Sequence, residues 1–233
     1  GPCMMCGGFS ENGGMFDYFK ESVYKTLFST FEIGEIKPNM NGWTDEELPW
    51  KDPANQSVKR QIKESQGFKF INGQGTVTGR LIGGSLEVME MLKGTKVWPS
   101  LDTYDGAIFF IETCEEAPPA DYVVRWMRNY AATGVLERLN GIVIGRPANV
   151  SVDELDKYAD AVLQVVKIEN NLDIPIVSNL DFGHTDPMFL LLPTVLSIQA
   201  EIQQIIFLSY KYEIKIVVLS AMYLNHAKVV INC

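Results

Sequence analysis

Hydrophobic and polar positions divide the middle of the chain into alternating strand and helix patterns. Residues 106–111 are continuously apolar and are bounded by Asp105 and Glu112, which predicts a strand buried on both faces. The helix and strand patterns that follow lie at residues 120–133, 141–145, 152–168 and 174–178. Because strands and helices alternate, the sequence predicts an α/β fold with parallel strands.

The first third of the chain has weaker patterns. Apolar residues at helical spacing predict a short amphipathic helix over residues 16–28. Residues 33–72 are polar and rich in proline, so a long irregular connection is expected there. A strand over 76–82, a turn at Gly83-Gly84 and a helix over 86–92 follow, with Ser85 as the helix N-cap.

Composition limits the classes of function. The chain has 233 residues, of which 46% are hydrophobic, and this is enough for a packed core. A net charge of -9 without a basic stripe argues against nucleic-acid and anionic-membrane partners. The four cysteines are scattered, which fits a reducing cytoplasm.

The two ends of the chain carry further expectations. No signal-peptide pattern precedes the helix at 16–28, and Gly1-Pro2-Cys3 suggests that the sequence starts inside a longer protein. The apolar stretch 202–224 is interrupted by Lys211, Glu213 and Lys215, so buried strands are expected there instead of a membrane span.

His184 is the stronger of the two histidine candidates. It follows the strand pattern 174–178 closely and precedes Pro187, whereas His226 lies in the tail without a neighbouring acid. A general-base histidine needs a carboxylate that fixes its tautomer and stabilises the imidazolium. The alternative is a loop histidine that is hydrogen-bonded for structure alone.

Three carboxylates could serve His184, namely Glu112, Asp181 and Asp186. Glu112 is favoured because it directly follows a fully apolar strand, which would leave it partly desolvated. Ligand sites in open α/β sheets form outside the carboxyl ends of strands, so Glu112 and His184 should share one edge if their strands are neighbours. The alternative for Glu112 is a solvated acid at the start of a charged run.

No convincing nucleophile accompanies this pair, because the chain contains no Gly-x-Ser-x-Gly elbow. Ser85 has a strand-turn-helix context, but the N-cap role explains it. Cys114 lies near Glu112, but its neighbours are acidic and would not lower the thiol pKa. An unrelated α/β enzyme that uses Ser85 or Cys114 stays open as a third reading.

The remaining motifs indicate neither a metal nor a cofactor. Cys3 and Cys6 have the spacing of half a zinc site, but no second pair completes four ligands. Trp43 and Trp50 stand in the polar connection, where nothing obvious buries them. Such aromatic residues stack on planar ligands or fill a neighbouring surface.

Several segments, taken together and in order, resemble the LD-carboxypeptidase family. They are residues 79–87, 106–112 and 141–146 and the run Asp181-Phe182-Gly183-His184-Thr185-Asp186-Pro187, with Trp43-Thr44-Asp45-Glu46 upstream. The last run is closer to the microcin C immunity branch of the family. The resemblance extends from Gly1 to about Pro193.

The resemblance implies a cytoplasmic, metal-free serine peptidase with a Ser-Glu-His triad, usually a homodimer. It also implies a flavodoxin-like N-terminal domain that bears the serine and a C-terminal swivelling β/α domain that bears Glu112 and His184. The expected divisions are a remnant of the first domain at 1–32, the connection at 33–72, the C-terminal catalytic domain at 73–200 and an atypical apolar tail at 201–233.

The expected substrate-binding residues are Trp43, Trp50, Ser85 and Asn179. In the immunity branch, the connection with the tryptophans closes over the nucleotide part of the substrate. Ser85 stands where the family usually has Asn. The family's serine lies in a Gly-x-Ser-Asp turn, which by resemblance falls roughly twenty residues before Gly1.

The leading hypothesis is a serine carboxypeptidase-like hydrolase that cleaves an amide bond of a muropeptide or a peptidyl-nucleotide. In it, the upstream serine attacks, His184 moves the proton and Glu112 orients His184. The alternative is a catalytically incomplete chain that only binds such a ligand, or a partner, through Trp43 and Trp50.

Overall fold

A computed structural model describes residues 7–49, 51–191, 195–199 and 204–208. The strands are β1 Gly34–Ile36, β2 Lys69–Asn72, β3 Thr76–Ser85, β4 Ile108–Glu112, β5 Gly141–Arg146, β6 Ile176–Gly183, β7 Val195–Gln199 and β8 Gln204–Leu208. The α-helices are α1 Asp17–Val23, α2 Leu86–Leu92, α3 Ala120–Ala132 and α4 Leu155–Leu163. The shorter helical turns are η1 Gly7–Ser10, η2 Tyr24–Phe28, η3 Pro53–Ser57, η4 Leu101–Tyr104, η5 Leu136–Arg138, η6 Val152–Glu154 and η7 Gln164–Glu169.

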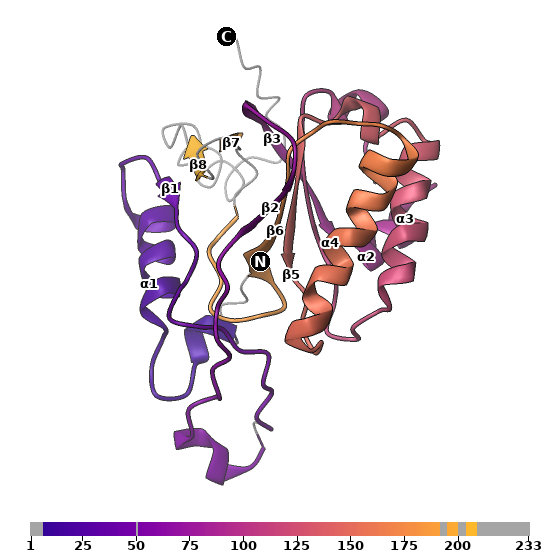
Figure 1. The fold of residues 1–233 in the computed structure, drawn as a ribbon. Helices are drawn as coiled ribbons and strands as arrows, with labels where there is room; N and C mark the ends of the chain where they lie inside the picture. The colour runs from indigo at the N-terminus through magenta and orange to yellow at the C-terminus, as the bar shows by residue number, and fades with distance from the viewer. Residues whose placement is uncertain (1–6, 50, 192–194, 200–203, 209–233) are drawn as a thin grey trace.

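The strands form a mixed sheet in the order β1-β8-β7-β3-β4-β5-β6-β2. Its centre, β3-β4-β5-β6, is parallel, which confirms the predicted β-α-β arrangement. The first half of β3 pairs with antiparallel β7, and its second half pairs with β4. The helices α2, α3 and α4 cover one face of the parallel strands, whereas α1 and β1 lie on the other side (Figure 1).

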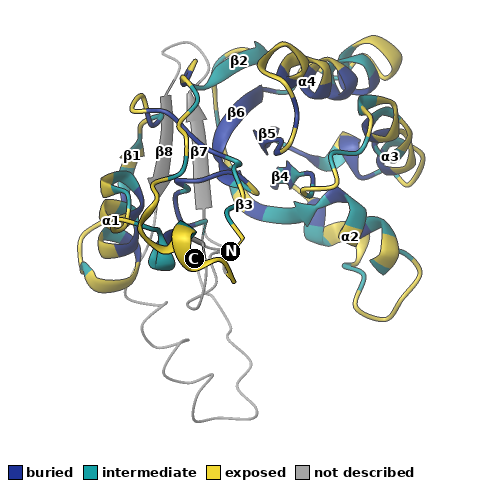
Figure 2. Ribbon diagram, turned by 90° about the horizontal axis from the view of Figure 1, so that it is seen from below, coloured by how far each residue is buried: buried dark blue, intermediate teal, exposed yellow. Residues whose placement is uncertain are grey.

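Both faces of β4 and β5 are largely buried, as their continuous apolar runs predict, and β6 is buried as well. Phe109 and Ile142 pack in the core beneath the helices, and Ile108 and Val143 pack in the core on the opposite face. Side chains of consecutive strand residues point to opposite faces, so an uninterrupted apolar run supplies both cores. The strands β4, β5 and β6 accordingly appear dark blue in Figure 2.

The predicted turn at Gly83-Gly84 is wrong. Both glycines belong to β3, where Gly83 pairs with Phe110 and Gly84 with Ile111. A side chain at position 83 would place its Cβ only 1.8 Å from the carbonyl oxygen of Phe110. Glycine is therefore required here because two strands approach each other closely. In the sequence, a glycine needed for close packing looks the same as a glycine needed for a turn.

The N-terminal predictions fare better. The helix expected over 16–28 is present as α1 and the π-helical turn η2, and the connection holds only short elements. Several expectations fall outside the described residues. They concern Trp50, His226, Cys3, Cys6 and the stretch 202–224 apart from β8. The domain boundaries at residues 32, 72 and 200 stay predictions.

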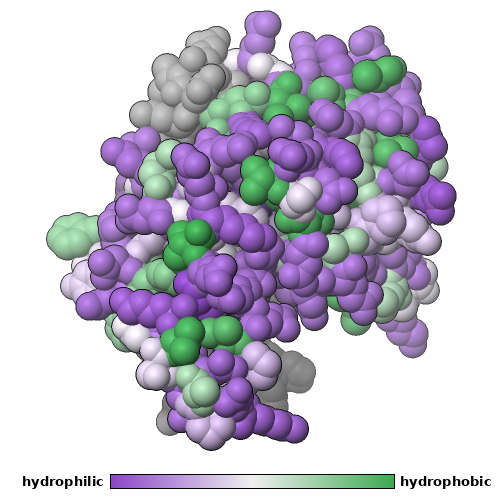
Figure 3. All heavy atoms as spheres, turned by 60° about the horizontal axis from the view of Figure 1, so that its bottom comes forward, coloured by the Kyte–Doolittle hydropathy of each residue, from purple (hydrophilic) through white to green (hydrophobic). Residues whose placement is uncertain are grey.

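Hydrophilic residues dominate the face shown in Figure 3, and the hydrophobic residues on it are scattered. Single exposed apolar side chains are normal on a protein surface. In the part of the chain that the structure describes, no helix is both long and apolar enough to cross a bilayer.

Candidate active site

The candidate site lies at the carboxyl ends of the parallel strands. Glu112 is the last residue of β4, and His184 directly follows β6. The two strands are not neighbours, because β5 lies between them. The sequence predicts that the two residues share an edge if their strands are neighbours. The strands are not neighbours, yet Glu112 and His184 lie at the same edge of the sheet.

The side chains of Glu112 and His184 meet. Nδ1 of His184 lies 2.6 Å from Oε2 of Glu112, which is hydrogen-bonding distance. The Glu112 side chain is 13% exposed, whereas the imidazole is 37% exposed. The other two candidate carboxylates are engaged elsewhere, Asp181 with Arg146 and Asp186 with Arg60. Of the three acids considered from the sequence, Glu112 is the one placed against His184.

Gly183 makes this contact possible. Its φ is +105°, and a Cβ at this position would lie 3.0 Å from Oε2 and 3.2 Å from Cβ of Glu112. Any larger residue would push against the carboxylate and would also strain the backbone. The glycine before the histidine therefore lets the end of β6 approach Glu112.

The charges around His184 favour its protonated form. Its hydrogen bond with Glu112 raises the imidazole pKa above its ordinary value, and the charges of Glu112, Glu115 and Glu87 act in the same direction. Partial burial opposes this rise. Nε2 lies 3.2 Å from Oε2 of Glu115, whose side chain is 54% exposed. Both ring nitrogens thus face carboxylates, and that of Glu115 is the more exposed to solvent.

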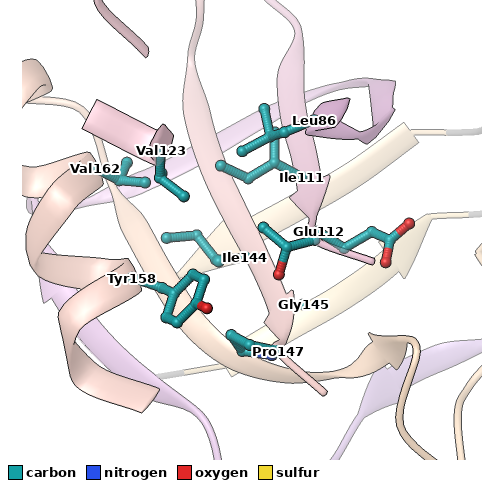
Figure 4. A pocket seen from close by; sticks show the side chains of 10 residues that line it. Leu86, Ile111, Glu112, Val123, Ile144, Gly145, Pro147, Tyr158 and Val162 are labelled. Atoms are coloured by element: carbon teal, nitrogen blue, oxygen red, sulfur yellow. The ribbon is translucent and has the colours of Figure 1, made fainter. Parts of the chain in front are cut away.

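A small apolar cavity lies beside Glu112, toward the helices (Figure 4). Its volume is about 10 Å³, which is room for one water molecule. The side chains of Val123, Ile144 and Val162 line it, and the carboxylate of Glu112 points away from it. The cavity is too small to admit a substrate.

Ser85 and Cys114 lie near the pair but are not activated. Ser85 pairs with Glu112 in the sheet, yet its hydroxyl donates to Oε2 of Glu87 at 2.9 Å. It occupies the N-cap position of α2 without making the expected capping hydrogen bond. Burial, together with the charges of Glu87 and Glu116, raises the pKa of the Cys114 thiol, which keeps it protonated.

The expectation that nothing buries Trp43 is wrong. Its side chain is 1% exposed, and Nε1 donates to the carbonyl of Glu64. Lys63 and Arg146 lie over its ring, with 4.6 Å from Nζ and 5.0 Å from Cζ to the ring centroid. A ring enclosed in this way cannot stack on a ligand, so Trp43 fixes the connection to the core. Trp50 lies outside the described residues.

Asn179, one of the expected substrate-binding residues, is also turned inward. Its side chain is 7% exposed, accepts from Nε of Arg146 and donates to the carbonyl of Gly67. Its φ of +61° is one that Asn tolerates better than most residues. These contacts hold the amide within the protein, between Arg146 and Gly67.

Sequence reasoning missed Arg146, which is fully buried at the end of β5. Nη2 of Arg146 donates to Oδ1 of Asp181 at 2.6 Å. A cation at the end of an otherwise apolar strand could have indicated this role, because a buried charge needs an ionic or hydrogen-bonding partner. In the described residues, no group of three or more His, Cys, Asp or Glu side chains is placed to hold a metal ion.

Comparisons with known proteins identify the family of the chain. The family model described as "LD-carboxypeptidase C-terminal domain" matches residues 78–202. The Vibrio cholerae protein named "Putative carboxypeptidase" is 30% identical over 189 residues, covering 81% of this chain and 52% of that protein. The Escherichia coli "Microcin C7 self-immunity protein MccF" is 24% identical over 197 residues, covering 82% and 53%.

A solved structure shares the fold. It is an MccF-like protein from Streptococcus pneumoniae in complex with AMP, 25% identical to this chain, with a TM-score of 0.71. The match covers 86% of this chain and 60% of that one. The chain spans about half the length of the curated relatives it matches.

Proposed function

The chain belongs to the LD-carboxypeptidase family, and we propose that it carries the base and the orienting carboxylate of a serine carboxypeptidase-like hydrolase. The observation that carries the proposal is the 2.6 Å contact between His184 and Glu112 at the carboxyl edge of the sheet. Ligand sites of open α/β sheets form at this edge. The proposed reaction is the hydrolysis of an amide bond.

In this mechanism Nδ1–H of His184 donates to Glu112, which leaves Nε2 as the base. A serine hydroxyl attacks the amide carbonyl, and its proton passes to Nε2. The carboxylate of Glu112 stabilises the imidazolium that forms. Nε2 then returns the proton to the leaving amine, and water hydrolyses the acyl ester by the same route. Glu115 must move away from Nε2 before the serine can approach.

The serine is proposed to come from outside this sequence. In the described residues the hydroxyl of Ser85, the serine closest in the sheet to Glu112, is bound to Glu87. The relatives are about twice as long as the matched segment, so their additional length can hold a nucleophile. The full activity is accordingly proposed for a protein of the relatives' length.

A peptidyl-nucleotide is the favoured substrate, and a muropeptide is the second candidate. The support is that the related pneumococcal protein, at 25% identity, is in complex with AMP. The burial of Trp43 weakens the alternative of a binding module that uses this ring. The expected homodimer and the cytoplasmic location stay predictions.

Hydrolysis of a peptidyl-adenylate analogue and of a muropeptide, followed by chromatography, tests the proposal. The protein extended to the relatives' length should cleave one of them, and His184→Gln or Glu112→Gln should lower kcat/KM by at least about a hundredfold. Glu137→Gln, at an exposed residue of the turn η5, is the matched control and should leave the rate unchanged. Cleavage of neither substrate, or full activity of His184→Gln, would contradict the proposal.

A further inference from the structure

The end of β6 contains more residues than the strand it pairs with. Ile176 pairs with Ile142 of β5, but by the time β5 reaches Arg146, β6 has already reached Gly183. The register shifts twice along this stretch, before Gly145 and again after it. Extra residues in one strand bend it and redirect its side chains, and such bulges occur next to active sites.

Arg146 and Asp181 hold the extra residues in place. Nε of Arg146 donates to Oδ1 of Asn179 at 2.8 Å, and Nη2 donates to the carbonyl of Asn179 and to Oδ1 of Asp181. Oδ2 of Asp181 accepts from the backbone of Asn39 at 2.8 Å. Arg146 and Asp181 are both fully buried. A planar guanidinium that spans a side chain and a backbone carbonyl fixes both in position.

The bend directs β6 toward β4, across the end of β5. A Cβ at Gly145 would lie 2.6 Å from the carbonyl oxygen of Phe182, so β5 makes room for β6 at this point. The next residue of β6, Gly183, is the one that touches Glu112. Two strands that flank a third lie roughly 10 Å apart. With a regular β6, the two side chains could meet only if both were fully extended, whereas the bend brings the backbone of Gly183 itself close to Glu112.

We propose that the buried Arg146–Asp181 pair is the positioning element that bends β6 over β5 and holds His184 against Glu112. Neither residue faces the substrate side, so their contribution is to the geometry of the pair and not to the chemistry. The inference rests on the proposed function only in giving the His184–Glu112 contact its purpose.

The double variant Arg146→Met/Asp181→Asn of the full 233-residue chain tests this proposal. It removes both charges together, so no unpaired charge is left buried and the net charge is unchanged. The readout is the pKa of the His184 imidazole from an NMR titration, with His226 as the reference histidine in the same spectrum. The groups that act on His184 directly, which are Glu112, Glu115 and Glu87, are untouched.

The expected result is a downward shift of the His184 pKa, toward that of an ordinary histidine, with no change at His226.

The single variant Arg146→Met separates the two possible effects on the His184 pKa. Loss of a nearby cation would by itself raise this pKa, whereas displacement of His184 from Glu112 lowers it. Asn179→Gly keeps the positive φ and removes only the side-chain contacts, so it serves if the other variants do not fold, and it should shift the pKa in the same direction. Folded variants with the wild-type His184 pKa would overturn the proposal. The readout involves no hydrolysis, so it is independent of the proposed function.

Discussion

Nδ1 of His184 and Oε2 of Glu112 lie 2.6 Å apart although a whole strand, β5, separates the strands that carry them. The contact exists because β6 bends across the end of β5 and because residue 183 is glycine. The pair is therefore a product of tertiary structure, and changes that straighten or lift the end of β6 should be visible at His184.

Gly183→Ala should destabilise the protein and disturb the pair. The backbone conformation at φ +105° costs alanine about 1–3 kcal/mol, and the new Cβ also presses on Glu112. Urea unfolding should report a loss larger than the conformational cost alone, and the His184 pKa should fall in the same variant.

The matched control for this change is Gly14→Ala. Gly14 has φ +100°, but no atom lies within 4 Å of the added Cβ. The Gly14→Ala variant should lose only the stability that the strained backbone conformation costs, and its His184 pKa should be unchanged. Equal losses of stability at both positions would show that the close approach of Gly183 to Glu112 has no energetic effect.

Glu115→Gln should lower the His184 pKa, but by less than the loss of Glu112. The hydrogen bond to Glu112 is the largest cause of the raised pKa, and the Glu115 charge acts more weakly. In the protein extended to the relatives' length, the variant should reach its maximal rate at a lower pH, because more of His184 is then neutral. A pH–rate profile identical to that of the wild type would exclude Glu115 from the environment of the base.

The free energy of unfolding should depend on pH through His184. Its folded pKa is raised, so its stabilising contribution is complete below the unfolded value of about 6.5 and is lost as the pH rises through the folded pKa. Urea unfolding at several pH values should therefore show stability falling across this window. In His184→Gln the fall should be smaller, and equal slopes in the two proteins would contradict the raised pKa.

Trp43→Ala should behave as a core substitution. The side chain is 1% exposed, so its removal should cost about 3–5 kcal/mol in unfolding free energy. Phe31→Ala is the control, because Phe31 is 80% exposed and its loss should change stability by no more than about 0.5 kcal/mol. A Trp43 variant as stable as the Phe31 variant would mean that the ring is not packed as described.

The sequence predicts the parallel strands and the edge that carries the site because both depend on local patterns. The uninterrupted apolar run of β4 indicates burial on both faces, and the position of Glu112 directly after it locates the sheet edge. The histidine follows the strand pattern 174–178, which the structure extends to Gly183 as the buried strand β6, so the same rule locates it at this edge. These features need no knowledge of the strand order.

The remaining features depend on contacts between distant segments. The bend of β6 is set by Arg146, which binds residues more than thirty positions along the chain. The burial of Trp43 depends on Lys63 and Arg146, and no periodic pattern near Trp43 reports them. Gly83 of β3 is required by the close approach of the Phe110 carbonyl of another strand. Local sequence patterns do not show contacts between distant segments. They also predict a turn wrongly where glycine is needed for close packing of strands.

The titration of the His184 imidazole in the wild-type chain and in Glu112→Gln tests the central claim most directly. If Glu112 orients and charges His184, the wild-type pKa lies above the ordinary value of about 6.5, and the substitution lowers it because the main cause of the shift is removed. The pKa of His226 serves as the internal reference. A His184 pKa that is the same in both proteins, with the fold intact, would contradict the claim.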